Sequence, residues 1–167
     1  MYARSMVVAV ALVGFAVCSW ADTPPACPIV GYEQLTKLVT HAKGKVVLVD
    51  IWFDACVPCK RGLPKVWGME RKYRDAGLVT LTVNVDDTGD EQTRARVIQF
   101  LSDQKASGIN VQLNERSQVW QQKLDVKYLP MVFLFDRQGQ LLRKWSDGVD
   151  YAQIEKRVQA ELETSQP

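Results

Sequence analysis

The stretch from Val46 to Pro64 constrains this chain more than any other. It opens with the run V-V-L-V-D-I, and an apolar, β-branched run this short is typical of a strand buried on both faces. Cys56 and Cys59 follow, and the segment from Lys60 to Arg74 has helical composition. Two cysteines at this spacing, between a buried strand and a helix, predict a redox-active disulfide.

The position of this pair gives each cysteine a different role. Unpaired N–H groups and the helix dipole stabilise a thiolate at a helix N-terminus, which is where Cys56 should lie, exposed to solvent. Cys59 comes about one turn later and should be more buried. We therefore expect Cys56 to be the nucleophile and Cys59 the resolving cysteine of a disulfide exchange that passes through a mixed disulfide.

Other uses of two cysteines are a structural disulfide and half of a zinc site. A zinc site needs four ligands. Cys27 and His41 are the other candidate ligands, and neither has ligand spacing, so we predict no metal site and no cofactor. The chain has 21 basic and 19 acidic residues mixed along its length, and lacks a basic patch with interleaved aromatics, which argues against a nucleic-acid partner.

The Val46–Pro64 stretch resembles the active site of the thioredoxin family. The matching residues share their type with thioredoxins at the same positions: Asp50, Trp52, Cys56, Pro58, Cys59, Lys60 and Pro64. The resemblance implies a thiol-disulfide oxidoreductase that acts on protein thiols and disulfides. It also implies that Asp50 lies behind Cys59 and exchanges a proton with it, and that Trp52 packs under the site. Thr82 stands where thioredoxin has a lysine beside this Asp.

A further match lies at Leu129–Pro130. Pro130 corresponds to the family's cis-proline, which lies beside the disulfide and leaves the backbone of the preceding residue, here Leu129, free to pair with a substrate strand. X-Pro bonds are the ones that adopt cis readily. An ordinary trans proline at the start of a strand is the alternative.

The rest of the chain predicts an α/β, thioredoxin-like fold with a mixed central sheet and helices on both faces. Apolar spacing and β-branched runs predict the elements, in chain order: helix 32–43, strand 46–51, helix 60–74, strand 78–85, helix 91–105, strand 109–113, helix 117–124, strand 131–135, strand 140–145 and helix 150–163. The extra helix and strand between Asp86 and Asp125 resemble the TlpA/ResA-type branch of exported thiol-disulfide proteins. That branch commonly has Glu where this chain has Gly62.

The N-terminus predicts export. Arg4 precedes an uncharged run that ends in Ser19-Trp20-Ala21, so residues 1–21 form a predicted signal peptide, residues 22–31 a mobile leader and residues 32–167 the domain. An uncleaved run would instead be a membrane anchor. Either version places the domain outside the cytoplasm, in the periplasm. Cys27 then lies in the leader as a mobile unpaired thiol, or as a third redox or intermolecular thiol.

The residues between the cysteines predict the direction of the reaction. The side chain of Val57 donates no hydrogen bond to the first sulfur, and Pro58 has no backbone N–H to offer. Lys60 and Arg61 should be screened by solvent. Cys56 should be only moderately acidic, which predicts a reductant that a membrane-bound electron donor recharges. A copper chaperone of the same fold is the alternative, although such proteins pair C-x-x-x-C with a distant His.

Overall fold

The computed structural model describes residues 26–164. Eleven elements follow one another in this part of the chain: β1 Ile29–Val30, α1 Tyr32–His41, β2 Val46–Trp52, α2 Val57–Tyr73, β3 Leu78–Asn84, α3 Glu91–Asp103, β4 Ile109–Leu113, α4 Ser117–Leu124, β5 Met131–Phe135, β6 Leu141–Ser146 and α5 Tyr151–Thr164. Their types and order are those predicted, apart from β1. The predicted signal peptide, residues 1–21, lies outside the described residues.

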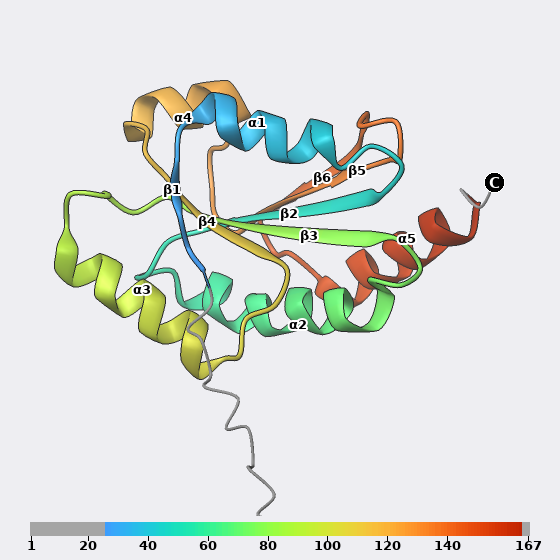
Figure 1. Cartoon of the computed structure of the whole chain (residues 1–167), viewed down its shortest axis with the longest axis horizontal. Coiled ribbons are helices and arrows are strands. Elements are labelled where there is room, and N and C mark those ends of the chain that lie inside the picture. Colours follow the sequence, from blue (N-terminus) through green and yellow to red (C-terminus); the bar gives the residue numbers. More distant parts are fainter. Residues whose placement is uncertain (1–25, 165–167) are drawn as a thin grey trace, which may run out of the picture.

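The strands form one mixed sheet in the order β1-β4-β3-β2-β5-β6. The strands from β1 to β2 pair in parallel, and β5 and β6 pair antiparallel to close the other side. Helices α1 and α4 cover one face, and α2, α3 and α5 cover the other (Figure 1). The predicted fold class is therefore confirmed.

Strand β2 lies at the centre of the sheet, paired on both edges and buried at all seven positions. Its alternate side chains enter two different cores because strand side chains alternate between faces. Val47, Val49 and Ile51 pack under α1 and α4. Val46 and Leu48 pack under α2 and α5. Asp50 and Trp52 continue this second row toward the start of α2.

Strand β1 is a difference from the sequence prediction. Ile29–Val30 pairs with Gln112–Leu113 of β4, and the Pro28 carbonyl accepts a hydrogen bond from Gln112 N–H at 2.9 Å. The end of the predicted mobile leader is thus part of the sheet. Two residues carry no periodicity of their own, so this pairing is not visible in the local pattern.

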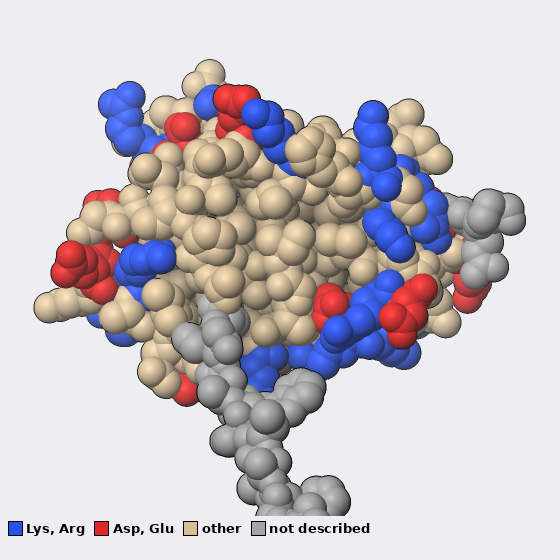
Figure 2. All heavy atoms as spheres, in the orientation of Figure 1, with Lys and Arg blue, Asp and Glu red and all other residues tan. Residues whose placement is uncertain are grey.

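Charged side chains of both signs are distributed over the face shown in Figure 2, around a central area of other residues. Lys and Arg lie beside Asp and Glu at several places on this face. A mixture of this kind gives no extended field of one sign on that face for the steering of a charged partner.

Helix α2 carries two glycines with different surroundings. A Cβ added at Gly62 would lie 2.2 Å from the ring of Tyr151 on α5, whereas a Cβ at Gly68 would meet nothing within 4 Å. Gly62 therefore marks a close contact between α2 and α5, and Gly68 does not.

This contrast predicts opposite effects of alanine at the two positions. Gly68→Ala should stabilise the protein by about 0.5–1 kcal/mol, because alanine is the better helix former. Gly62→Ala should destabilise it by about 1–3 kcal/mol, because the new methyl group overlaps Tyr151. Urea denaturation of both variants measures the two effects. Equal stability of the two variants would mean that α5 moves away from α2 without a loss of stability.

Candidate redox site

The two predicted cysteines are joined as a disulfide, with their Cα atoms 5.3 Å apart. Cys56 is the N-cap of α2, so its Sγ occupies the place where a capping oxygen normally lies. It accepts a hydrogen bond from Cys59 N–H at 3.3 Å. Pro58 occupies the first turn, where its missing N–H leaves no bond unmade. The sequence therefore places the disulfide at the helix N-terminus, as predicted.

Cys56 is less exposed than predicted. It is 5% exposed and Cys59 is 0% exposed, so the order is as expected but neither sulfur lies open to solvent. The reason is a cluster of aromatic and aliphatic side chains around the pair, from β2, α2 and α3. The cluster consists of Trp52, Leu63, Trp67, Val97 and Leu101, with Phe53, Phe100 and Leu129 at its margin.

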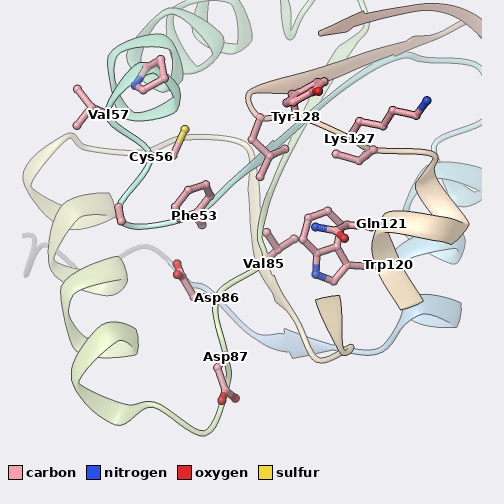
Figure 3. A pocket seen from close by; sticks show the side chains of 14 residues that line it. Phe53, Cys56, Val57, Val85, Asp86, Asp87, Trp120, Gln121, Lys127 and Tyr128 are labelled. Carbon is pink, nitrogen blue, oxygen red and sulfur yellow. The ribbon is translucent and has the colours of Figure 1, made fainter. Parts of the chain in front are cut away.

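Cys56 instead reaches solvent through a hollow of about 810 Å³ (Figure 3). The cysteine side chain projects beside Phe53, and Tyr128, Trp120 and Val85 lie across the hollow. The residues that line it are Phe53, Ala55, Cys56, Val57, Pro58, Val85, Asp86, Asp87, Trp120, Gln121, Val126, Lys127, Tyr128 and Leu129. A partner sulfur would meet Cys56 in these largely apolar surroundings.

The loop between β2 and α2 is held by a network of carboxylates. Asp54 N–H donates to Asp86 Oδ2 at 2.7 Å, and the Asp54 carboxylate binds Lys60 and Arg96, each at 2.8 Å. Burial raises the pKa of Asp54, but the hydrogen bonds from Arg96 and Lys60 outweigh it and hold that pKa below its usual range. The prediction that solvent screens the charge of Lys60 is therefore wrong. Its charge is paired with Asp54, and its Nζ lies 4.5 Å from the centre of the Phe100 ring.

The Leu129–Pro130 peptide bond is cis, as predicted. Leu129 packs against the cluster around the cysteines and lines the hollow beside Cys56. Pro130 is buried at the start of β5, and it lines a second hollow together with Pro58 and Tyr128. Leu129 and Pro130, which come directly before β5, therefore lie next to the start of α2.

Trp52 is 1% exposed and packs in the same cluster as both cysteines, as predicted. Its ring lies 5.6 Å from that of Phe100. Its indole Nε1 is buried and has no hydrogen-bond partner in the described part of the chain. Trp52 therefore supports the disulfide by packing.

Asp50 is completely buried, which excludes a carboxylate that reaches solvent from a strand end. It lies opposite Thr82 in the register of β2 and β3. Thr82 Oγ1 donates to Asn110 Oδ1 at 2.7 Å and so does not serve Asp50. The hydrogen bond to Asp50 comes from α5, where Tyr151 Oη donates to Asp50 Oδ2 at 2.8 Å.

The second oxygen of Asp50, Oδ1, is buried without a hydrogen-bond partner among the described residues. Burial raises the pKa of Asp50 to about 7, and the hydrogen bond from Tyr151 works against this rise. The pKa of Tyr151 is itself raised, first by burial and then by the charge of Asp50 and the bond to it. The carboxyl group of Asp50 thus titrates near neutral pH.

Cys27 is buried, at 8% exposure, and belongs to the cluster that surrounds the disulfide. The expectation of a mobile thiol is wrong, because β1 holds this segment against β4 and Arg94 donates to the Cys27 carbonyl at 3.2 Å. Burial raises the pKa of the Cys27 thiol to about 11, which the charge of Arg94 offsets only in part. A thiol that stays protonated is a poor nucleophile, so nothing here favours a third redox cysteine.

Two residues of the site were not predicted from the sequence, Tyr151 and Trp120. Tyr151 shows the spacing of a core residue on α5, and its bond to Asp50 spans 101 positions of the chain. Trp120 likewise has the pattern of a core residue of α4, and it is 5% exposed, yet it lines the hollow beside Cys56. The departure at Gly62 was the one local signal, since it leaves the room that Tyr151 fills.

No group of three His, Cys, Asp or Glu side chains that could hold a metal ion occurs among residues 26–164. The copper-chaperone alternative thus gains no support from the arrangement of side chains. Within the same residues, no helix is both long and apolar enough to cross a membrane.

Comparison with known proteins gives the family. The thioredoxin-like family model matches residues 44–141, so the chain belongs to the thioredoxin-like family. Among curated proteins, the chain is similar to protein DipZ of Mycobacterium tuberculosis, with 28% identity over 152 residues, and to the thiol-disulfide oxidoreductase ResA of Bacillus subtilis, with 29% identity over 107 residues. The matches cover 90% and 63% of this chain, but 20% of DipZ and 55% of ResA.

A solved structure of similar form is that of a thiol:disulfide interchange protein DsbE from Chlorobium tepidum. It is 27% identical, with a TM-score of 0.62, over 74% of this chain and 84% of that one. These relatives confirm the resemblance to the ResA-type branch. The chain thus combines membership of the thioredoxin-like family with a cysteine pair that is bonded at the N-terminus of α2.

The burial of Asp50 predicts how stability depends on pH. An Asp in an unfolded chain titrates near 3.9, and Asp50 titrates at about 7 in the folded protein, so the folded state binds this proton more tightly. The free energy of unfolding should therefore fall as the pH rises from about 4 through about 7, by on the order of 4 kcal/mol from this group.

Asp50→Asn should remove this dependence, because the amide does not titrate. The variant should be more stable than the natural protein at pH 8, and the difference should disappear below about pH 4. Urea denaturation of the oxidised protein at several pH values measures it. Asp75→Asn, at an exposed position, is the matched control. A difference that does not change with pH would contradict a raised pKa of Asp50.

Proposed function

We propose that the protein reduces disulfide bonds of other proteins, with Cys56 as the nucleophile and Cys59 as the resolving cysteine. The observation that carries the proposal is the disulfide at the N-terminus of α2, with Cys56 at the hollow and Cys59 fully buried. The Cys56 thiolate attacks one sulfur of a substrate disulfide and releases the other as a thiol. Cys59 then attacks Cys56, which releases the second substrate thiol and leaves the Cys56–Cys59 disulfide.

Asp50 serves as the base for the second step. Cys59 must lose its proton before it attacks, and it is buried where water does not take the proton directly. Asp50 lies on the same face of β2 as Trp52, which belongs to the same buried cluster as Cys59. A carboxyl group that titrates near the working pH is the most effective general base, and burial brings Asp50 into that range.

The substrate chain binds along the segment that ends in the cis Leu129–Pro130 bond. Leu129 and Pro58 border the hollow at Cys56, and Pro130 lies at the adjoining one. The Leu129 backbone pairs with an extended substrate strand, and the apolar walls around Phe53 and Trp120 receive a substrate side chain. A protein segment with an apolar residue near its cysteine fits these surroundings.

The surroundings of Cys56 support a reducing direction. Strong oxidants of this fold are oxidising because their reduced thiolate is highly stabilised. Cys56 Sγ has one hydrogen-bond donor in the described structure, Cys59 N–H. Lys60, near the start of α2, is paired with Asp54. The thiolate thus gains little beyond the helix N-terminus, and electrons pass from the protein to its substrates.

We also propose that the protein works outside the cytoplasm, in the periplasm. Residues 1–21 have the pattern of a signal peptide, and they act as an N-terminal membrane anchor if the peptide is not cleaved. A reductant in an oxidising compartment must be recharged, so a membrane-bound electron donor reduces the Cys56–Cys59 disulfide. Cell fractionation with N-terminal sequencing of the mature protein tests both the compartment and the cleavage site; a cytoplasmic protein would exclude this proposal.

The order of the two cysteines predicts their reactivity. In the reduced protein near pH 7, alkylation should label Cys56 well ahead of Cys59, because Cys59 is fully buried. Mass spectrometry of peptides after a short pulse of iodoacetamide measures both. Cys59→Ser should in addition accumulate mixed disulfides with its substrates, and Cys56→Ser should not. Equal labelling of the two cysteines would exclude the assignment.

The proposed direction of electron transfer, from the protein to its substrates, predicts the reduction potential. Equilibration with glutathione buffers should give a value on the reducing side of about −180 mV, and the protein should reduce insulin. A potential near about −120 mV would show an oxidant and would contradict the argument from the surroundings of Cys56. Val57→Ala is a suitable control, because it changes the exposed side chain between the cysteines without the addition of a donor.

A further inference from the structure

The contact between Tyr151 and Asp50 joins α5 to the redox site. Tyr151 is the first residue of α5, and it is 6% exposed. Its hydroxyl donates to Asp50 Oδ2 at 2.8 Å in the buried space between α2 and β2. A buried tyrosine hydroxyl needs a partner, and a buried carboxylate needs a donor, so each group satisfies the other.

Gly62 makes this contact possible. It lies one turn after Cys59 on α2, and a Cβ at this position would lie 2.3 Å from the Tyr151 hydroxyl. Any side chain there would occupy the space that the tyrosine ring fills. The ring therefore lies directly against the turn of the helix that follows the resolving cysteine.

The two oxygens of Asp50 are not equivalent. Oδ2 accepts the bond from Tyr151, whereas Oδ1 has no partner in the described structure although it is buried. Thr82, opposite Asp50 on β3, is already occupied, since it donates to Asn110 Oδ1, which also accepts from Trp67. Oδ1 is thus the oxygen left free to take a proton.

We propose that Tyr151 is the positioning residue of the proton exchange, in that it holds Asp50 Oδ2 and leaves Oδ1 to exchange a proton with Cys59. The proposal rests on the role of Asp50 as the base. The donated hydrogen bond stabilises the charged carboxylate, so Tyr151 counteracts the effect of burial. It keeps Asp50 able to lose its proton near neutral pH.

Few other groups that titrate or carry charge lie around this pair. Lys65 on α2 places its Nζ 5.6 Å from the centre of the Tyr151 ring. One turn along α5, Glu155 binds Lys72 and the Tyr73 hydroxyl. The neighbours of Asp50 on β3 and β5, Thr82 and Val132, do not titrate. Besides Cys59, the groups to consider in a pH profile are therefore Lys65, Lys72, Tyr73 and Glu155.

Tyr151→Phe tests the proposal, since it removes the hydroxyl and keeps the ring. The pKa of Asp50 should rise, because its carboxylate loses the donor. Its carboxyl titration, followed by carbon NMR in the oxidised protein, should move upward by about one pH unit. The rate of mixed-disulfide resolution should shift by the same amount, which is a fall of roughly tenfold on the low-pH side of the profile.

Tyr73→Phe is the matched control, because it also removes a tyrosine hydroxyl bound to a carboxylate between α2 and α5, but that carboxylate is Glu155. It should leave both midpoints unchanged. Gly62→Ala, which displaces the ring, should shift them as Tyr151→Phe does, and Gly68→Ala should not. This second pair keeps the test decisive if Tyr151→Phe does not fold.

An Asp50 titration that is unchanged in Tyr151→Phe would overturn the proposal. So would a shift that Tyr73→Phe reproduces, or a shifted titration with an unchanged rate profile. Asp50→Asn separates this failure from that of the proposed base. If that variant keeps the natural pH profile of resolution, Asp50 is not the base. If it loses the profile while Tyr151→Phe leaves it in place, the base stands and Tyr151 has no part in it.

Discussion

The burial of β2 on both faces is the constraint on which the rest of the structure depends. A strand in this position has both edges paired and both faces covered, so each of its side chains must be apolar or must find a polar partner inside the protein. Asp50 is the one residue of β2 that breaks the apolar pattern. Its charge is tolerated because α5 brings a hydroxyl to it, and its pKa is raised because water does not reach it.

The disulfide depends on the same strand. Trp52, at the end of β2, packs under both cysteines, and the chain turns directly from there into α2. The turn is held by Asp86, which follows the neighbouring strand β3, and by the pairing of Asp54 with Lys60 and Arg96. The helix N-terminus, which stabilises a thiolate, is thereby set at the carboxyl ends of β2 and β3.

The same features limit the electrostatic stabilisation of a thiolate at Cys56. Lys60 and Arg96 are both paired with Asp54, and the residues between the cysteines donate no hydrogen bond from their side chains. What remains for Cys56 is the N-terminus of α2 and one N–H group. The pKa of the more deeply buried carboxyl group, Asp50, is in contrast set by burial and by one hydrogen-bond donor, Tyr151. In the reaction that we propose, α2 therefore controls the first step and α5 the second.

Local sequence was enough to predict the strands and helices after β1, the cysteine pair at a helix start and the acid in the central strand, because each of these rests on neighbouring residues. The cis bond before Pro130 was predicted from the resemblance to the thioredoxin family. The other features came from the packing of distant elements. It paired Ile29–Val30 with β4 and so buried Cys27, and it filled the space above Gly62 with Tyr151. Contacts of this kind join elements far apart in the chain, and they depend on how whole helices pack, which local periodicity does not report.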